Sequence, residues 1–212
     1  MIKRFSRRRF PVSFHASVLA PAALLLAGAL PLAACNQTPS AEAPPLAGAD
    51  VGGPFTLMDK TGKTVKWSDF RGRYTTVYFG YTFCPDACPL DMQALMKGFN
   101  TFAKAHPALA AKVQPIFITI DPARDTPQVV GEWTAAFSPK LLGLTGSAAQ
   151  VKQAADAFAA YYKRGESTPG GGYLMDHTRA AYLMGPDGKP IALLPIDQSP
   201  EAVAQTLSQW VK

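Results

Sequence analysis

Three side chains in this sequence can bind a soft metal ion or carry redox chemistry: Cys84, Cys88 and His177. The cysteines lie four residues apart in the segment GYTFCPDACP, and such a pair can share a metal ion or close a disulfide. His177 follows Asp176 in YLMDHT. Structural zinc sites require four ligands, whereas Cu(I) readily accepts a three-coordinate site rich in thiolates. The donor set therefore favours copper.

Four aspartates near these residues are candidates for a supporting role. Cu(II) needs an oxygen or water to complete a square arrangement, and Asp86 or Asp176 can supply that oxygen. Asp121 and Asp125 lie in the segment DPARDTP. We expect these two carboxylates to orient His177 or to contact a partner, although a simple turn followed by a helix cap explains the same residues.

Two predicted strands place the cysteines and the DPARDTP segment at one edge of a sheet. Tyr74–Tyr81, rich in β-branched and aromatic residues, precedes the cysteines, and Val113–Ile120 precedes Asp121. A helix starting at Pro89 connects the two strands, which implies that they pair in parallel. Ligand sites of α/β sheets gather at the carboxyl ends of such strands. The following helix N-terminus also favours thiolate over thiol.

The remaining elements predict an α/β domain with a thioredoxin-like fold. Its central sheet is mixed, helices flank it, and a β-hairpin extends it at the N-terminus. We expect a glycine-rich loop, Gly170–Gly172, to lead into a second hairpin and to bring His177 opposite the cysteines. The other predicted elements are the first hairpin (Phe55–Met58 and Thr64–Trp67), a helix from Pro127 to Phe137, a strand Leu141–Leu144, a helix Ser147–Tyr162, the second hairpin (Thr178–Met184 and Pro190–Leu194) and a final helix opened by Ser199.

Charge is concentrated at the N-terminus of the chain. The 212 residues carry a formal net charge of +6, but residues 1–34 hold five basic side chains and no acidic one. Residues 35–212 contain 16 basic and 15 acidic residues. The basic character therefore belongs to the leader and gives no reason to expect nucleic-acid binding.

The first 34 residues resemble a lipoprotein signal peptide. A basic start precedes an apolar run, which ends in the sequence Leu-Ala-Ala-Cys at residues 32–35. We expect Cys35 to be lipidated and to anchor the protein at the periplasmic face of a bacterial membrane. An uncleaved anchor helix is the alternative. The arginines at positions 7–9 fit either a twin-arginine export signal or an ordinary basic start.

The segment 35–50, rich in Pro, Ala and small polar residues, predicts a flexible tether, and residues 51–212 predict one domain. Lipidation of Cys35 leaves Cys84 and Cys88 as the remaining cysteines. A disulfide between residues so close in sequence closes a very small loop, so it restricts the unfolded chain little. The pair is therefore expected to act chemically rather than as a structural cross-link.

Three segments in register resemble the Sco/SenC family of copper-binding assembly proteins: VYFGYTFCPDACP, ITIDPARDTP and YLMDHTRAAYLMGPDG. The resemblance covers essentially all of residues 51–212. It implies that Cys84, Cys88 and His177 bind copper as Cu(I) or Cu(II). It also implies delivery of copper to the CuA site of cytochrome c oxidase, or reduction of the thiols there. The implied partners are the CuA-bearing subunit and a copper donor protein. Thr178, Arg179 and the glycine-rich loop depart from the usual family pattern.

A thiol–disulfide oxidoreductase that works without metal is the main alternative function. The resemblance of such enzymes to thioredoxin implies a cis-proline facing the cysteines, but residues 173–183 contain no proline. A peroxiredoxin-type peroxidase fits less well, because such enzymes have Thr or Ser three residues before the reactive cysteine, where this chain has Tyr81 and Pro85. One cysteine pair can both transfer copper and reduce thiols, because both tasks need thiolates. Whether the chain is an enzyme stays open at this level.

Overall fold

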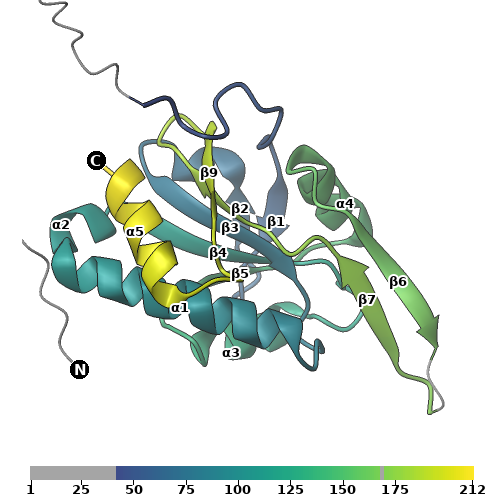
Figure 1. The fold of residues 1–212 in the computed structure, drawn as a ribbon. Coiled ribbons are helices and arrows are strands. Elements are labelled where there is room, and N and C mark those ends of the chain that lie inside the picture. Colours follow the sequence, from purple (N-terminus) through teal and green to yellow (C-terminus); the bar gives the residue numbers. More distant parts are fainter. Residues whose placement is uncertain (1–41, 168–169) are drawn as a thin grey trace, which may run out of the picture. The chain divides into compact units, whose positions relative to one another are not determined.

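A five-stranded mixed sheet forms the centre of the domain (Figure 1). The computed structural model describes residues 42–167 and 170–212. The predicted signal peptide, Cys35 and the first part of the predicted tether lie outside these residues. The central strands β3, β4 and β5 are parallel, and β8 and β9 extend the sheet in antiparallel pairing. The strand order is β5 (Leu142–Leu144), β4 (Val113–Thr119), β3 (Tyr74–Gly80), β8 (Ala181–Met184) and β9 (Pro190–Leu194).

Helices cover the sheet as the sequence predicts for this fold class. Two of them, α1 (Ala87–Ala105) and α5 (Pro200–Trp210), pack side by side, and α3 (Pro127–Ala135) packs against β5 (Figure 1). The side chain of Ser199 accepts a hydrogen bond from the backbone of Ala202, so it caps α5 as predicted. The other helical elements are α2 (Pro107–Ala110), α4 (Ala148–Ala157) and the 3-10 turn η1 (Trp67–Phe70).

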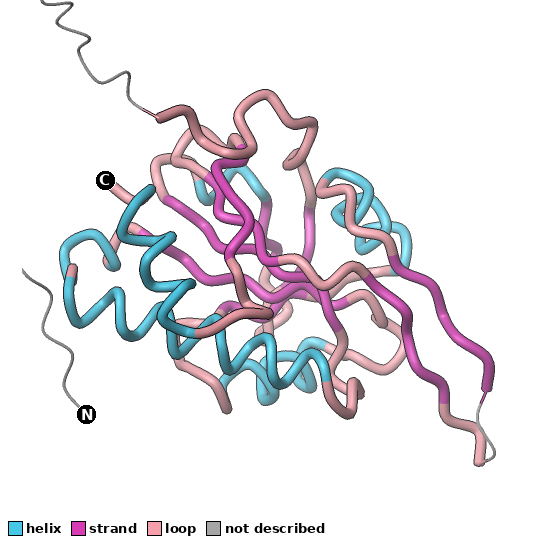
Figure 2. The backbone as a smooth tube through the Cα atoms, in the orientation of Figure 1, coloured by secondary structure: helices cyan, strands magenta, loops and turns pink. Residues whose placement is uncertain are grey.

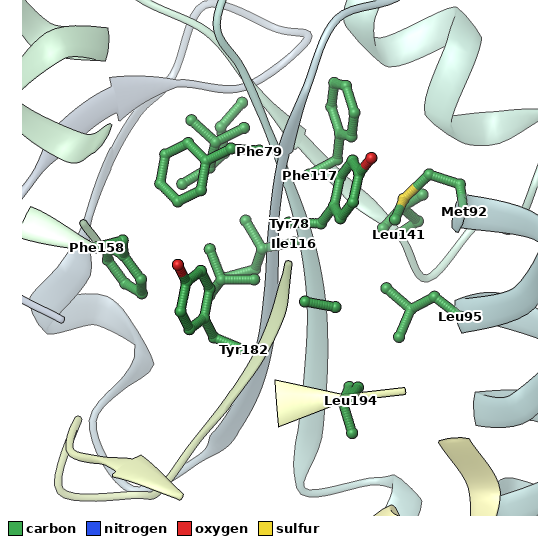
Figure 3. Packing of buried hydrophobic residues seen from close by; sticks show 14 of the residues in the cluster. Tyr78, Phe79, Met92, Leu95, Ile116, Phe117, Leu141, Phe158, Tyr182 and Leu194 are labelled. Carbon is green, nitrogen blue, oxygen red and sulfur yellow. The ribbon is translucent and has the colours of Figure 1, made fainter. Parts of the chain in front are cut away.

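Alternating side chains of β3 fill both faces of the sheet. Tyr78 points toward Met92 and Leu95 of α1, whereas Phe79 points toward Phe158 on the other face (Figure 3). On that second face, Phe158 also contacts Trp67 of η1 in an edge-to-face arrangement, with ring centroids 5.3 Å apart. The predicted N-terminal hairpin, β1 (Thr56–Met58) and β2 (Thr64–Lys66), forms a small sheet of its own.

A further hairpin, which the sequence analysis did not predict, extends away from the central sheet. It consists of β6 (Tyr162–Ser167) and β7 (Tyr173–His177), which pair antiparallel as two long neighbouring strands (Figure 2). The expected glycine-rich loop, Gly170–Gly172, lies outside the strands as predicted, but the residues after it form β7, and His177 is the last residue of that strand. The strand that follows starts at Ala181 rather than at Thr178.

Two predicted helix boundaries are wrong, one by five residues and the other by two. The helix expected to run to Tyr162 ends at Ala157, and Ala159 then takes a positive φ of 50°. The helix expected to start at Pro89 starts two residues earlier, at Ala87. Proline is acceptable in a first turn because the N–H groups there have no partner within the helix. The earlier start puts Cys88 inside the first turn of α1.

The described part of the predicted tether contacts the domain. The backbone N–H of Leu46 donates a hydrogen bond of 2.9 Å to the carbonyl of Ile191 in β9, and Leu46 packs against the core. Ordered contacts therefore begin before residue 51, the domain boundary predicted from composition. Within residues 42–167 and 170–212, no helix combines the length and apolar character needed to cross a membrane.

Candidate metal centre

The two cysteines lie where β3 gives way to α1. Cys84 is in the connecting loop and Cys88 is in the first helical turn, and both are free thiols. The backbone N–H of Cys88 donates to the sulfur of Cys84 across 3.3 Å. A helix N-terminus offers free N–H groups and partial positive charge. The fold therefore places the Cys84 sulfur at the N-terminus of α1, where a backbone N–H group donates to it, as the sequence predicted.

His177 reaches the cysteines from the end of β7. Its Nε2 lies 3.3 Å from the sulfur of Cys88. Its Nδ1 lies 3.0 Å from the carbonyl oxygen of Thr178. Since a carbonyl oxygen only accepts hydrogen bonds, Nδ1 carries the proton and the Nε2 lone pair of the neutral ring faces the sulfur. The rings of Tyr78 and Tyr81 meet the imidazole edge to face, with centroids 6.2 and 5.9 Å away.

The surroundings shift the pKa values of these three side chains in different directions. Burial raises the pKa of Cys88 to about 12. Burial also acts to raise the pKa of Cys84, but hydrogen bonds from the backbone of Cys88 and Asp86 outweigh it, and the net pKa is lowered. Burial lowers the pKa of His177, which keeps the imidazole neutral. Cys84 is therefore the more readily formed thiolate.

The donor set fits a small soft metal ion. A sulfur and a nitrogen bound to one ion lie closer together than the sum of the two bond lengths, about 4.3 Å when each bond is as long as in zinc sites. The 3.3 Å between the Cys88 sulfur and Nε2 of His177 satisfies this limit. Over the part of the chain that the structure describes, no three Cys, His, Asp or Glu side chains are already grouped as metal ligands. The Cys88 sulfur and Nε2 of His177 are therefore close enough to share one ion. The Cys84 sulfur lies beside them, hydrogen-bonded to the backbone N–H of Cys88.

Asp121 and Asp125 are buried beside the site but do not contact the imidazole. Asp125 accepts hydrogen bonds from the Thr82 backbone and from the hydroxyls of Thr82 and Thr119, at 3.0, 2.6 and 2.6 Å. Asp121 forms an ion pair with Arg124. It also accepts a bond of 2.7 Å from the Tyr173 hydroxyl. These carboxylates therefore fix the loop before Cys84 and the start of β7, and the carbonyl of Thr178 orients the ring.

Asp86 and Asp176 are both exposed to solvent. Asp86 occupies the N-cap position of α1, and its side chain makes no capping hydrogen bond. Asp176 immediately precedes His177 on β7, where it pairs in register with Lys163 of β6. Neither side chain is placed as a ligand by the described contacts, so their predicted role as oxygen ligands of Cu(II) stays a prediction.

A polar cluster that was not predicted from the sequence lies next to the site and is formed by Tyr78, Asp91 and Arg179. Asp91 is 1% exposed and accepts a hydrogen bond of 2.8 Å from the Tyr78 hydroxyl. Arg179 donates to both of its carboxylate oxygens, at 2.6 and 3.0 Å. One signal was present, because Asp91 follows Cys88 by three residues and so lies on the same face of a predicted helix. Its partner Arg179 lies far away in the sequence.

Arg124 and Tyr173 form a second cluster that sequence reasoning did not find. The guanidinium of Arg124 lies 3.6 Å from the centroid of the Tyr173 ring, and that of Arg164 lies 3.8 Å from the same centroid. Arg124 also donates to the Tyr173 carbonyl at 3.0 Å. The ring is thus contacted by two guanidinium groups, which fastens the β6–β7 hairpin to the loop after β4.

Gly80, the last residue of β3, makes room for the Cys88 thiol. A Cβ atom at this position would lie 3.1 Å from the Cys88 sulfur and 2.8 Å from a ring carbon of Tyr78. Both distances are shorter than ordinary van der Waals contacts. The absence of a side chain at residue 80 therefore allows the sulfur to pack against the end of the strand.

The fold and the site together define a thioredoxin-fold protein that carries a dithiol and a facing imidazole. The fold is also that of the thioredoxin domain of a Bacteroides vulgatus thiol-disulfide oxidoreductase, with a TM-score of 0.53 and 17% identity over 76% of this chain and 96% of that one. Residues 43–212 match the SCO1/SenC family model. The chain belongs to the SCO1/SenC family, as its motifs predicted.

Several relatives support this assignment. The chain is 40% identical to protein SenC of Rhodobacter capsulatus over 162 residues, which cover 76% of this chain and 71% of that protein. It is 42% identical to the human mitochondrial SCO2 homolog over 136 residues, which cover 64% of this chain. The match spans half the length of that human protein.

Solved structures of the family are similar over the whole domain. The copper-bound structure of ScoI from Bradyrhizobium japonicum has a TM-score of 0.68 and 36% identity, covering 76% of this chain and 99% of that one. The copper-bound structure of yeast Sco1 has a TM-score of 0.69 and 34% identity, covering 76% of this chain and 88% of that one. These relatives were therefore crystallised with the metal that the donor set of this chain favours.

Proposed function

We propose that this protein binds one copper ion through Cys84, Cys88 and His177. The observation that carries the proposal is the 3.3 Å separation between the Cys88 sulfur and Nε2 of His177, with Nδ1 engaged by the Thr178 carbonyl. This hydrogen bond leaves the Nε2 lone pair available to a metal. Two thiolates suit Cu(I), and the imidazole adds a donor that Cu(II) accepts well.

The bound copper is cargo in this proposal. The protein delivers it to the CuA site of cytochrome c oxidase during assembly, with the CuA-bearing subunit as acceptor and a separate copper donor protein as source. Support comes from membership of the SCO1/SenC family and from relatives crystallised with copper bound. Cys88 is fully buried, whereas Cys84 is 9% exposed and His177 is half-buried, so we expect the partner to reach the copper on the side of Cys84 and His177.

Copper titration tests the proposal. Cu(I) and Cu(II) are added separately to the reduced full chain, and we expect one copper per chain and thiolate-to-Cu(II) charge-transfer absorption. Cys84→Ser, Cys88→Ser and His177→Ala should each abolish that absorption. His106→Ala is the matched control, since His106 is exposed at the end of α1. A wild-type chain that retains neither copper ion refutes the proposal.

Thiol reduction is a second candidate function, favoured by the lowered pKa of Cys84 beside the buried Cys88 thiol. In this reaction the Cys84 thiolate attacks a partner disulfide and Cys88 resolves the mixed disulfide. Two electrons and two protons pass from the pair to the partner, which gains two thiols while Cys84 and Cys88 form a disulfide. Exchange at an unchanged rate in His177→Ala, together with no retained copper in the wild type, would favour this function.

Membrane attachment through a lipid on Cys35, at the periplasmic face of a bacterial membrane, completes the proposal. Its support is the Leu-Ala-Ala-Cys sequence at the end of an apolar leader. Cys35→Ala should release the protein from the membrane fraction, and mass spectrometry should find diacylglycerol on Cys35 of the wild type. Lysine in place of Arg7 and Arg8 should block export if the leader uses the twin-arginine route. Unchanged fractionation of Cys35→Ala would refute lipid anchoring.

A further inference from the structure

An ion pair connects the chain segment that carries His177 to the helix that carries Cys88. Arg179 lies two residues after His177, and Asp91 lies three residues after Cys88. The guanidinium donates to both carboxylate oxygens, at 2.6 and 3.0 Å. A bidentate pair between Arg and a carboxylate fixes both distance and orientation. The pair therefore restrains the same two segments that meet at the metal centre.

The carboxylate of Asp91 is buried, and its charged partner is Arg179. Its side chain is 2% exposed, whereas that of Arg179 is 50% exposed. The Tyr78 hydroxyl donates a third hydrogen bond to Asp91, and the Tyr78 ring packs edge to face on the His177 imidazole. A buried carboxylate without charged partners is strongly disfavoured. Asp91 thus draws Arg179, and with it the backbone after His177, toward α1.

The Tyr173 contacts hold the start of β7, but the end of the strand that carries His177 has no backbone pairing with the central sheet. β7 pairs with β6 rather than with the central sheet, and β8 joins that sheet only from Ala181 onward. The segment between His177 and Ala181 is the bridge between the two sheets. Arg179 lies in the middle of this bridge, two residues after His177, so the ion pair ties the bridge to α1 close to the imidazole.

We propose that Asp91 is a positioning residue, whose ion pair with Arg179 holds Nε2 of His177 against the sulfur of Cys88. The consequence for copper rests on the function proposed above. Cu(I) is held well by two thiolates, whereas Cu(II) gains more from the imidazole. Loss of the ion pair therefore weakens Cu(II) binding more than Cu(I) binding. A general loss of stability would weaken both.

The first test needs no copper. The imidazole resonances of His177 in the reduced, metal-free full chain report its packing against Tyr78 and Tyr81. Asp91→Asn and Arg179→Gln should each shift or broaden them, while Asp156→Asn should not, since it breaks an exposed ion pair with Lys152. If Asp91→Asn fails to fold, Arg179→Gln still decides, because it leaves the Tyr78–Asp91 hydrogen bond in place. Unchanged His177 resonances in Arg179→Gln overturn the proposal.

The second test compares the two copper oxidation states. Replacement of groups that orient a metal ligand typically lowers affinity by about 10- to 100-fold. We expect a loss of about tenfold or more for Cu(II) and of less than about threefold for Cu(I) in Arg179→Gln. The double variant Asp91→Asn with Arg179→Gln should lose no more Cu(II) affinity than either single variant. Each of the three variants removes the same ion pair. Equal losses for Cu(I) and Cu(II) overturn the proposal. A wild-type chain that binds neither refutes the copper function instead, and the metal-free test still decides the role of Asp91.

Discussion

The sulfur of Cys88 lies 3.3 Å from Nε2 of His177, although 89 positions separate the two residues in the sequence. Cys88 belongs to the first turn of α1, directly after β3, and His177 ends β7, shortly before β8. The antiparallel pairing of β3 with β8, which aligns Tyr78 with Ala181, brings the two segments together. The contact is therefore set by sheet topology.

Alkylation should distinguish the two cysteines. Cys84 has a lowered pKa, whereas Cys88 is fully buried and its pKa is raised. Since the thiolate is the nucleophile, iodoacetamide should modify Cys84 at least about tenfold faster than Cys88 in the reduced, metal-free protein. Peptide mass spectrometry over a time course measures both rates. Denatured protein is the control, and similar rates in the native protein would contradict the assignment.

Alkaline pH should destabilise the reduced protein through Cys88. Burial raises the pKa of Cys88 in the folded state to about 12, from an ordinary value of 9.0. The folded state therefore holds this proton more tightly, and its contribution to stability is present below about pH 9 and is lost as the pH rises toward about 12. Urea unfolding of wild type and Cys88→Ser should show a difference in unfolding free energy that shrinks over this range. A difference independent of pH would refute this role of Cys88.

Removal of the Asp125 carboxylate should destabilise the fold. Asp125 accepts three hydrogen bonds from Thr82 and Thr119 and is fully buried. Asp125→Ala leaves these donors without a partner, so we expect a loss of about 2–4 kcal/mol in unfolding free energy. Asp86→Ala is the control, because Asp86 is exposed, and should change stability by less than about 0.5 kcal/mol. Denaturant titration measures both, and equal effects would contradict the assigned contacts.

A methyl group at Gly80 should disturb the Cys88 thiol. The added Cβ would lie 3.1 Å from that sulfur and 2.8 Å from the Tyr78 ring. Overpacking of this kind costs about 1–3 kcal/mol, and the displaced sulfur should weaken copper binding in Gly80→Ala. Thermal unfolding and copper titration measure the two effects. If Gly80→Ala has the stability and the copper affinity of the wild type, the end of β3 accommodates the methyl group without displacing Cys88.

Loss of the Tyr173 ring should loosen the β6–β7 hairpin. The ring is contacted by Arg124 and Arg164, and its hydroxyl donates to Asp121. Tyr173→Ala removes all three contacts, so amide hydrogen exchange in β6 and β7 should become faster while exchange in β3 and β4 stays unchanged. Leu174→Ala is the control, since Leu174 is half exposed. If amide exchange in β6 and β7 is as slow in Tyr173→Ala as in the wild type, the ring does not anchor the hairpin.

Local sequence patterns predicted the central sheet well but failed for the β6–β7 hairpin. Apolar β-branched and aromatic residues mark β3 and β4, which are buried on both faces. By contrast, β6 has the sequence YKRGES and is largely exposed, so it shows no apolar alternation. The predicted helix over α4 was too long. Helix propensity is a local quantity, whereas the end of α4 is set by the packing of Phe158 against Trp67 in the core.

The sequence alone determined the domain class, the dithiol at a strand–helix junction and the single histidine that faces it. These features depend on residue types and short spacings, which are visible along the chain. Tertiary structure decided which atom of His177 meets Cys88, which thiol has the lower pKa, and that Asp91 pairs with Arg179. Each of these depends on burial and on contacts between distant segments, and both arise only when the strands pair and the helices pack.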